Sequence, residues 1–164
     1  MVREILKLGD PRLYACSDPV DPKEESLLQL WVQDLHDTLM DYRKTYGAGR
    51  AVAAPQIGVP KRLIYLYLER PWVIVNPELT FPDRETYELL DDCMSFPGLM
   101  VLVSRYKRAD IQYQDEHFQT RSMHLEGDIS ELIQHEYDHL DGILATMRAV
   151  DQKSLFLGQM KREF

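Results

Sequence analysis

The stretch GDISELIQHEYDHLDG, residues 127–142, carries the signals that begin and end one complete helix. Asp128 belongs to the residue types that cap helix N-termini, and glycine, here Gly142, is the residue most often found just after a helix. The pattern therefore predicts a helix that starts near Asp128 and closes at Gly142. We expect the rest of the fold to be organised around this helix.

Three polar side chains of the predicted helix share one face. His135 and His139 lie about 40° apart, and Glu136 lies about 60° beyond His139. Leu132 falls in the same arc, so the arc faces the core. Neutral imidazoles on successive turns can bind Zn²⁺ or Fe²⁺, and the glutamate between them can move protons for a water molecule. The same residues are compatible with plain hydrogen bonding in a half-buried helix, so both interpretations stay open.

A third ligand would distinguish a metal site from a polar helix face, because catalytic zinc sites commonly use three protein ligands. Downstream, the only distant glutamate is Glu163, next to last in the chain, where chains usually fray. Upstream, Cys93 can bind a metal as a thiolate, although a lone cysteine is more often a small buried hydrophobic residue. Its polar neighbours Asp91, Asp92 and Ser95 favour a site.

Length and composition limit the classes of protein to which the chain can belong. The 164 residues, 45% of them hydrophobic, predict one domain, residues 1–164. The net charge of −8, without a Lys/Arg-rich run, argues against direct binding to nucleic acid or to a membrane. With no long apolar run and no signal-peptide pattern, we expect a soluble, cytoplasmic protein. The two cysteines give no evidence of a disulfide, and Cys16 is expected to be a packing residue.

The remaining segments predict one more long helix and a sheet. Residues 25–45 carry an apolar stripe typical of an amphipathic helix, formed by Leu28, Val32, Leu35, Leu39 and Tyr42. Residues 45–60 predict a loop or irregular strand, because glycines and Pro60 interrupt regular structure. Short runs rich in β-branched and aromatic residues predict strands at 62–68 and 72–79.

Partial alternation of apolar and polar residues at 101–114 and 118–127 predicts two further strands across the polar turn at Asp115 and Glu116. The expected fold class is therefore α+β. A mostly antiparallel sheet packs around the central metal-binding helix, with an N-terminal amphipathic helix and a short C-terminal helix.

Three segments of the chain, in this order, resemble the motifs of the peptide deformylases. GRAVAAPQ (49–56), DDCMS (91–95) and QHEYDH (134–139) are similar to GxGxAAxQ, EGCLS and HExxDH of that family. ILKLGDPRL near the start and PGLMVLVSR after the cysteine also look like the family, so the resemblance covers nearly the whole chain. Three ordered motifs are far more specific than one.

The resemblance implies a metal-dependent hydrolase that removes the formyl group from N-terminal formyl-methionine and releases formate. The metal ligands it implies are Cys93, His135 and His139. One divalent ion would be bound, Fe²⁺ in the first place, with Zn²⁺, Ni²⁺ or Co²⁺ as substitutes. Glu136 would transfer protons from water to the leaving amine. The Gln56 side chain and the backbone N–H of Met94 would stabilise the developing oxyanion.

The resemblance also implies how substrate binds. A formylated nascent peptide, met at the ribosome, would add as a strand along Gly49, Arg50 and Ala51. Leu132 would form an apolar wall for methionine, whereas its neighbour Glu131 is expected to face solvent.

Two departures from the family pattern concern the substrate entrance. Ala51 stands where the first motif has a glycine, and Asp91-Asp92 replaces Glu-Gly. Asp91 can still accept a hydrogen bond from Arg105, with shifted geometry or through a water molecule. These departures keep two alternatives open: an amidohydrolase acting on another formamide or small amide, and a non-catalytic metal-containing binding protein.

Overall fold

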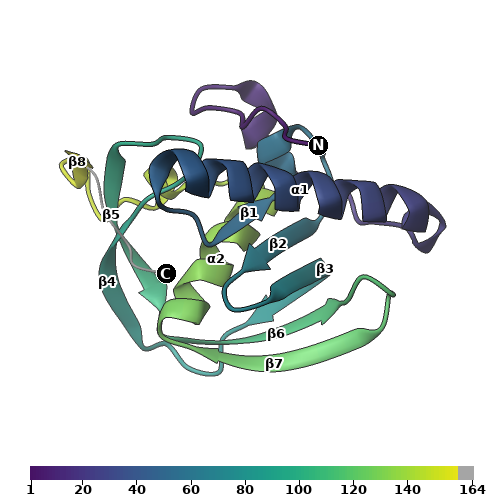
Figure 1. The fold of residues 1–164 in the computed structure, drawn as a ribbon. Coiled ribbons are helices and arrows are strands. Elements are labelled where there is room, and N and C mark those ends of the chain that lie inside the picture. The colour runs from purple at the N-terminus through teal and green to yellow at the C-terminus, as the bar shows by residue number, and fades with distance from the viewer. Residues whose placement is uncertain (159–164) are drawn as a thin grey trace.

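The computed structural model describes residues 1–158 and has an α+β fold built from two α-helices and eight strands (Figure 1). The helices are α1 (Glu25–Tyr46) and α2 (Asp128–Leu140). The strands are β1 (Ala51–Ala53), β2 (Leu63–Tyr67), β3 (Pro71–Thr80), β4 (Thr86–Asp91), β5 (Leu99–Tyr106), β6 (Arg108–Gln114), β7 (Thr120–Glu126) and β8 (Leu155–Leu157). Short 3₁₀ turns lie at Pro11–Tyr14, Pro22–Glu24, Ala54–Ile57 and Ala145–Arg148.

The strands form two antiparallel sheets with α2 packed against both of them. The larger sheet has the order β1-β2-β3-β6-β7, and the smaller one has the order β4-β5-β8. Helix α2 contacts β1, β2 and β7 of the first sheet and β5 of the second. The expected α+β class with a mostly antiparallel sheet around the central helix is confirmed.

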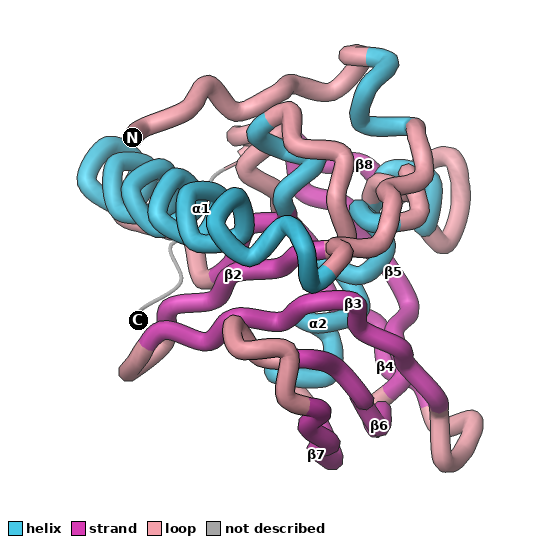
Figure 2. The backbone as a smooth tube through the Cα atoms, turned by 90° about the vertical axis from the view of Figure 1, so that its right-hand side faces the viewer, coloured by secondary structure: helices cyan, strands magenta, loops and turns pink. Residues whose placement is uncertain are grey.

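Strand β2 is buried on both faces because the two helices cover opposite sides of it. Successive side chains of a strand point to opposite faces. Leu63 and Tyr65 pack in the hydrophobic cluster that contains the buried leucines of α1. Ile64 and Leu66 pack in the cluster that contains Leu132 of α2. Figure 2 shows α1 on one side of β2 and β3 and α2 on the other.

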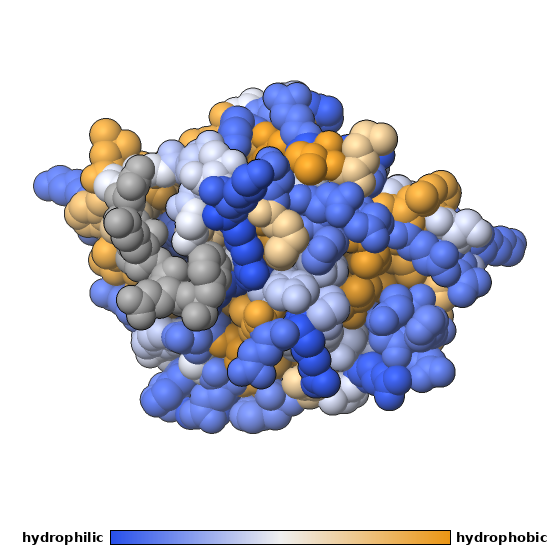
Figure 3. Space-filling view, in the orientation of Figure 1, coloured by the Kyte–Doolittle hydropathy of each residue, from blue (hydrophilic) through white to orange (hydrophobic). Residues whose placement is uncertain are grey.

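The surface fits this division between core and solvent. The face drawn in Figure 3 is mostly hydrophilic, and hydrophobic residues appear on it only in separate patches. Among the described residues, no helix combines the length and the apolar character needed to cross a bilayer.

The structure differs from the sequence-based expectations in how three segments are divided. The segment 101–114 is not one strand, because the chain leaves the smaller sheet after Tyr106 and enters the larger one at Arg108. Strand β4, just before the cysteine, was not expected. Strand β1 does form within the expected irregular segment, and it is only three residues long.

The start of the central helix and the segment after it also need correction, whereas Gly142 (φ 72°) follows the C-cap residue Asp141 as expected. Gly127 (φ 64°) occupies the N-cap position and Asp128 is the first helical residue, so Asp128 is not the cap. A glycine fits here because L-residues rarely adopt positive φ. After α2, the described chain forms only the 3₁₀ turn Ala145–Arg148 and strand β8. The expected C-terminal helix therefore has no other counterpart up to residue 158, and residues 159–164 lie outside the described part.

The packing of α1 leads to a stability prediction. Leu35 is fully buried in the cluster between α1 and the larger sheet, whereas Leu30 on the same helix is 61% exposed. Leu35→Ala should lower the free energy of unfolding by about 2–5 kcal/mol, because it leaves a cavity. Leu30→Ala should change it by less than about 0.5 kcal/mol. Urea unfolding followed by circular dichroism measures both; equal losses would contradict this description of the core.

Candidate metal centre

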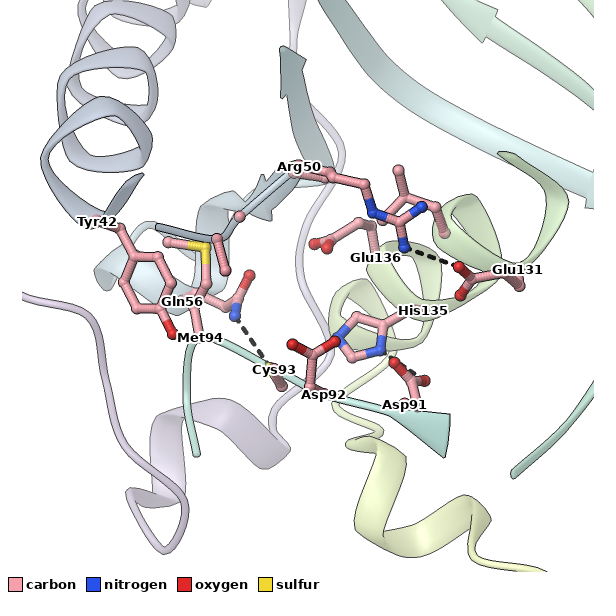
Figure 4. A pocket seen from close by; sticks show the side chains of 14 residues that line it. Tyr42, Arg50, Gln56, Asp91, Asp92, Cys93, Met94, Glu131, His135 and Glu136 are labelled. Atoms are coloured by element: carbon pink, nitrogen blue, oxygen red, sulfur yellow. Dashed lines mark hydrogen bonds and ion pairs between the residues drawn. The ribbon is translucent and has the colours of Figure 1, made fainter. Parts of the chain in front are cut away.

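Three segments far apart in sequence bring their side chains together beside one cavity. Helix α2 supplies His135, Glu136 and His139. Cys93 comes from the loop just after β4, and Gln56 from the 3₁₀ turn that follows β1. Figure 4 shows most of these side chains converging from different elements.

The thiol of Cys93 and the imidazoles of His135 and His139 form a buried cluster. One potential ligand atom from each residue lies within 4.8 Å of the other two, and Cys93 Sγ is 3.3 Å from His139 Nε2. All three residues are at least 93% buried, since none has an exposed fraction above 7%. Such a group of polar side chains in a core needs a common partner.

The chemistry of this cluster fits a divalent transition-metal ion. A thiolate and two imidazoles can hold such an ion only where their ligand atoms lie close together, and here all three lie within 4.8 Å of one another. Burial and the charge of His135 lower the pKa of His139 well below 6.5. His139 is therefore neutral near pH 7, the form of imidazole that binds metals.

Asp91 orients the imidazole of His135 through its Nδ1 atom, and Arg105 in turn holds Asp91. His135 Nδ1 lies 2.9 Å from Asp91 Oδ2, which would leave Nε2 for a metal ion. Burial lowers the pKa of His135, but Asp91 and Cys93 outweigh it and raise that pKa well above 6.5, so a metal ion at Nε2 would replace a proton. Arg105 Nη2 donates to the same oxygen at 3.1 Å, so the shorter aspartate side chain reaches the arginine directly, without a bridging water. Burial raises the pKa of Asp91, but His135 and Arg105 outweigh it and lower that pKa to about 2. Arg105 also donates to Asp138 at 2.6 Å.

Glu136 lies beside the cluster with an unsatisfied oxygen. The residue is 4% exposed, and its Oε2 has no hydrogen-bond partner among residues 1–158. Burial raises the pKa of Glu136 to about 7, although the charge of His135 lowers it. A buried carboxylate oxygen without a protein partner is positioned to exchange a proton with a small molecule in the cavity.

The side chain of Gln56 is fixed so that its amide nitrogen points at the cluster. Gln56 Oε1 accepts from the backbone N–H of Ala53 at 2.9 Å. The opposite end, Nε2, donates to Ser95 Oγ at 3.1 Å and to Cys93 Sγ at 3.4 Å. Met94, the residue after Cys93, also lines the cavity. The amide nitrogen of Gln56 is therefore a polar donor beside the candidate metal position.

The expected substrate-binding residues Gly49, Arg50, Ala51 and Leu132 all line the same cavity. Sequence reasoning missed their neighbour Glu131, which was expected in solvent but is 3% exposed. Arg50 Nη2 donates to Glu131 Oε1 at 2.7 Å, so the carboxylate is buried as half of an ion pair. Burial raises the pKa of Glu131 to about 7, although Arg50 lowers it. The missed signal was spacing, because Glu131 precedes His135 by four residues and shares its helix face.

Cys16 does not belong to this centre. It was expected to be a packing residue, but it is exposed, and its Sγ contacts the backbone oxygen of Asp141 at 3.6 Å. The two cysteines thus differ in environment, since only Cys93 is buried among imidazoles.

Comparison with known proteins agrees with this site. A sequence model of the polypeptide deformylase family matches residues 2–155. The chain is 36% identical over 173 residues to peptide deformylase 1 of Prochlorococcus marinus, covering 98% of this chain and 88% of that protein. It is 36% identical over 150 residues to a peptide deformylase-like protein of Brucella melitensis, covering 90% of this chain and 88% of that protein.

Among solved structures, the peptide deformylase from Thermotoga maritima matches with a TM-score of 0.84 and 31% sequence identity. The match covers 92% of this chain and 99% of that one. The likeness thus extends over the whole fold.

A metal site flanked by a buried carboxylate is an arrangement typical of metal-dependent hydrolases, and this chain is a protein of that class. It belongs to the polypeptide deformylase family, as its motifs indicated.

Proposed function

We propose that this chain, as a single domain over residues 1–164, hydrolyses the N-formyl amide of formylated peptides and releases formate. The observation that carries this proposal is the buried Cys93–His135–His139 cluster with the unpartnered carboxylate oxygen of Glu136 beside it. Membership of the deformylase family supports the reaction, and the cavity at the cluster supports its location.

The residues of the proposed metal centre have separate roles in the reaction. Cys93, His135 and His139 would hold one divalent ion, which when bound supplies a Lewis acid that activates water and polarises the formyl oxygen. Glu136 accepts the proton of the attacking water at Oε2 and later delivers it to the nitrogen of the leaving amine. Asp91 keeps His135 in place, and Arg105 keeps Asp91 charged.

The metal that we propose is Fe²⁺, with Zn²⁺, Ni²⁺ or Co²⁺ as substitutes. The donor set supports a transition metal, because thiolate and imidazole are softer ligands than the oxygens that Mg²⁺ and Ca²⁺ prefer. Metal analysis of protein purified without air tests which ion is bound.

The proposed partners are formylated nascent peptides, met at the ribosome in the cytoplasm. Strand β1 is at the edge of its sheet, which supports the binding of a peptide as an added strand along Gly49, Arg50 and Ala51. The net charge of −8 favours binding through the peptide rather than directly to RNA.

Gln56 should stabilise the negative charge that develops on the formyl oxygen, together with the backbone N–H of Met94. Gln56→Ala is therefore expected to lower kcat about 10²-fold while metal content stays the same. Gln33→Ala on the exposed face of α1 is the control and should leave kcat unchanged. Steady-state formate release with metal analysis measures both. An unchanged kcat in the Gln56 variant would rule out this role.

A formate-release assay tests the proposed function as a whole. The Fe²⁺-loaded protein is incubated without air with formyl-Met-Ala and, in parallel, with other formyl dipeptides. Acetyl-Met-Ala is the control, because it differs only at the acyl group. Formate from a formyl peptide supports the proposal. No formate from any of them, at one metal ion per chain, would instead favour a metal-containing binding protein.

A second candidate function keeps the metal chemistry and changes the substrate to another formamide or small amide. The Arg50–Glu131 ion pair in the cavity wall favours this candidate, because an apolar wall would suit methionine better.

A further inference from the structure

The cavity at the metal cluster is small for a methionine side chain. Its volume is about 50 Å³. For comparison, an engineered cavity of about 150 Å³ is of the size that takes up benzene, a molecule similar in bulk to the methionine side chain. A formyl group and a water molecule would therefore fill most of this space. A large side chain would therefore either displace part of the wall or extend from the cavity toward solvent.

The part of the wall beside Leu132 is an ion pair. Arg50 precedes β1 and Glu131 belongs to the first turn of α2, so the pair links the strand to the helix. The two side chains are 18% and 4% exposed and their charged atoms are 2.7 Å apart. Figure 4 shows Arg50 extending toward Glu131 beside His135 and Glu136.

This ion pair disfavours an apolar substrate side chain for two reasons. An apolar group packed against the pair removes water from charged atoms without replacing its hydrogen bonds. If Arg50 instead swings away to make room, its 2.7 Å ion pair with Glu131 is broken in a buried position, which is costly. A hydroxyl group avoids both costs, because it can donate to the carboxylate and accept from the guanidinium.

We propose that the Arg50–Glu131 pair makes this site select formylated residues with a short, polar side chain, such as formyl-serine, over formyl-methionine. The proposal rests on the deformylase function above: it keeps the reaction but replaces the formyl-methionyl nascent chain with formylated peptides that begin with a short, polar residue. Ala51 acts in the same direction, because its methyl group stands at the same cavity where the family motif has a glycine.

The test compares formyl-Ser-Ala with formyl-Met-Ala in three forms of the metal-loaded protein. The first is the wild type. The second is the double variant Arg50→Leu with Glu131→Leu, which makes the wall apolar. The third is the control Lys61→Leu with Glu24→Leu, which removes a 2.8 Å ion pair that lies away from the cavity and has side chains 20% and 24% exposed. Thermal unfolding checks that all three forms are folded.

A charge-swapped form, Arg50→Glu with Glu131→Arg, keeps the proposal testable if the apolar double variant does not fold. It keeps an ion pair in the wall and should keep the preference for serine. A second readout does not depend on the metal: binding of the products Ser-Ala and Met-Ala to the metal-free protein, followed by NMR titration, should show the same order.

The expected result is that wild type and control have a kcat/KM at least about tenfold higher for formyl-Ser-Ala, and that the apolar double variant reverses the order. A wild-type preference for formyl-Met-Ala would overturn this inference and leave the deformylase function standing. The inference also fails if the double variant keeps the wild-type ratio. If no form releases formate from either peptide, both the inference and the proposed function fall.

Discussion

Replacing Cys93 with alanine is expected to remove bound metal and formate release together. As a thiolate, Cys93 would be the only anionic ligand of the three, and the two imidazoles alone should compete poorly with water for the ion. Changes outside the ligand set already cost about 10–100-fold in affinity, so the loss of a ligand should exceed about 100-fold. Metal content after dialysis against a weak chelator, measured by atomic emission, gives the first readout, and formate release gives the second.

Cys16→Ala is the matched control for this experiment. The substitution is the same, but Cys16 is exposed and lies outside the cluster. It should therefore leave metal content and kcat unchanged. Stoichiometric metal of unchanged affinity in the Cys93 variant would be incompatible with the proposed ligand set.

Glu136→Gln is expected to lower kcat by about 10³-fold and to leave metal content unchanged. General acid–base catalysis by one side chain contributes about 10²–10⁴-fold, and glutamine cannot carry the proton. Glu136 is not one of the three clustered ligand residues, so the ion should stay bound. Because Glu136 Oε2 is buried without a protein partner, neutralising the side chain should not lower the melting temperature.

The control for Glu136 is Glu88→Gln, a change of the same kind at an exposed position of β4. It should have no effect on kcat. A Glu136 variant with nearly full activity, or one that loses metal in parallel with activity, would show that this carboxylate does not act in proton transfer.

The helices and the first two long strands could be predicted because their signals are local. The α1 stripe repeats with the period of a helix, and the short apolar and aromatic run of β2 has the length and composition of a buried strand. The boundary between β5 and β6 was missed because only Lys107 separates them, and neither glycine nor proline marks the turn. Apolar and polar residues continue to alternate on both sides of Lys107, so a pattern of period two cannot show that the chain changes sheets there.

The residues of the site could also be predicted only in part. Cys93, His135 and His139 were found from motifs in the sequence, and the structure brings them together. The ion pair between Arg50 and Glu131 was not found, because its members are 81 positions apart and neither residue alone indicates the other. Pairings across the fold depend on how strand and helix pack, which no local pattern records.

The burial of β2 between α1 and α2 has a consequence for how the metal is reached. The α2 side of this strand packs in the same cluster as Leu132, three residues before His135. Any outward displacement of α2 would open the hydrophobic contacts of the larger sheet, and local opening of that kind has a free energy close to that of global unfolding. The scaffold is therefore stiff where the ligands are anchored. Exchange of ions and substrates should therefore depend on the side chains at the cavity mouth, and substitutions there can change the entrance without moving the ligand residues on α2.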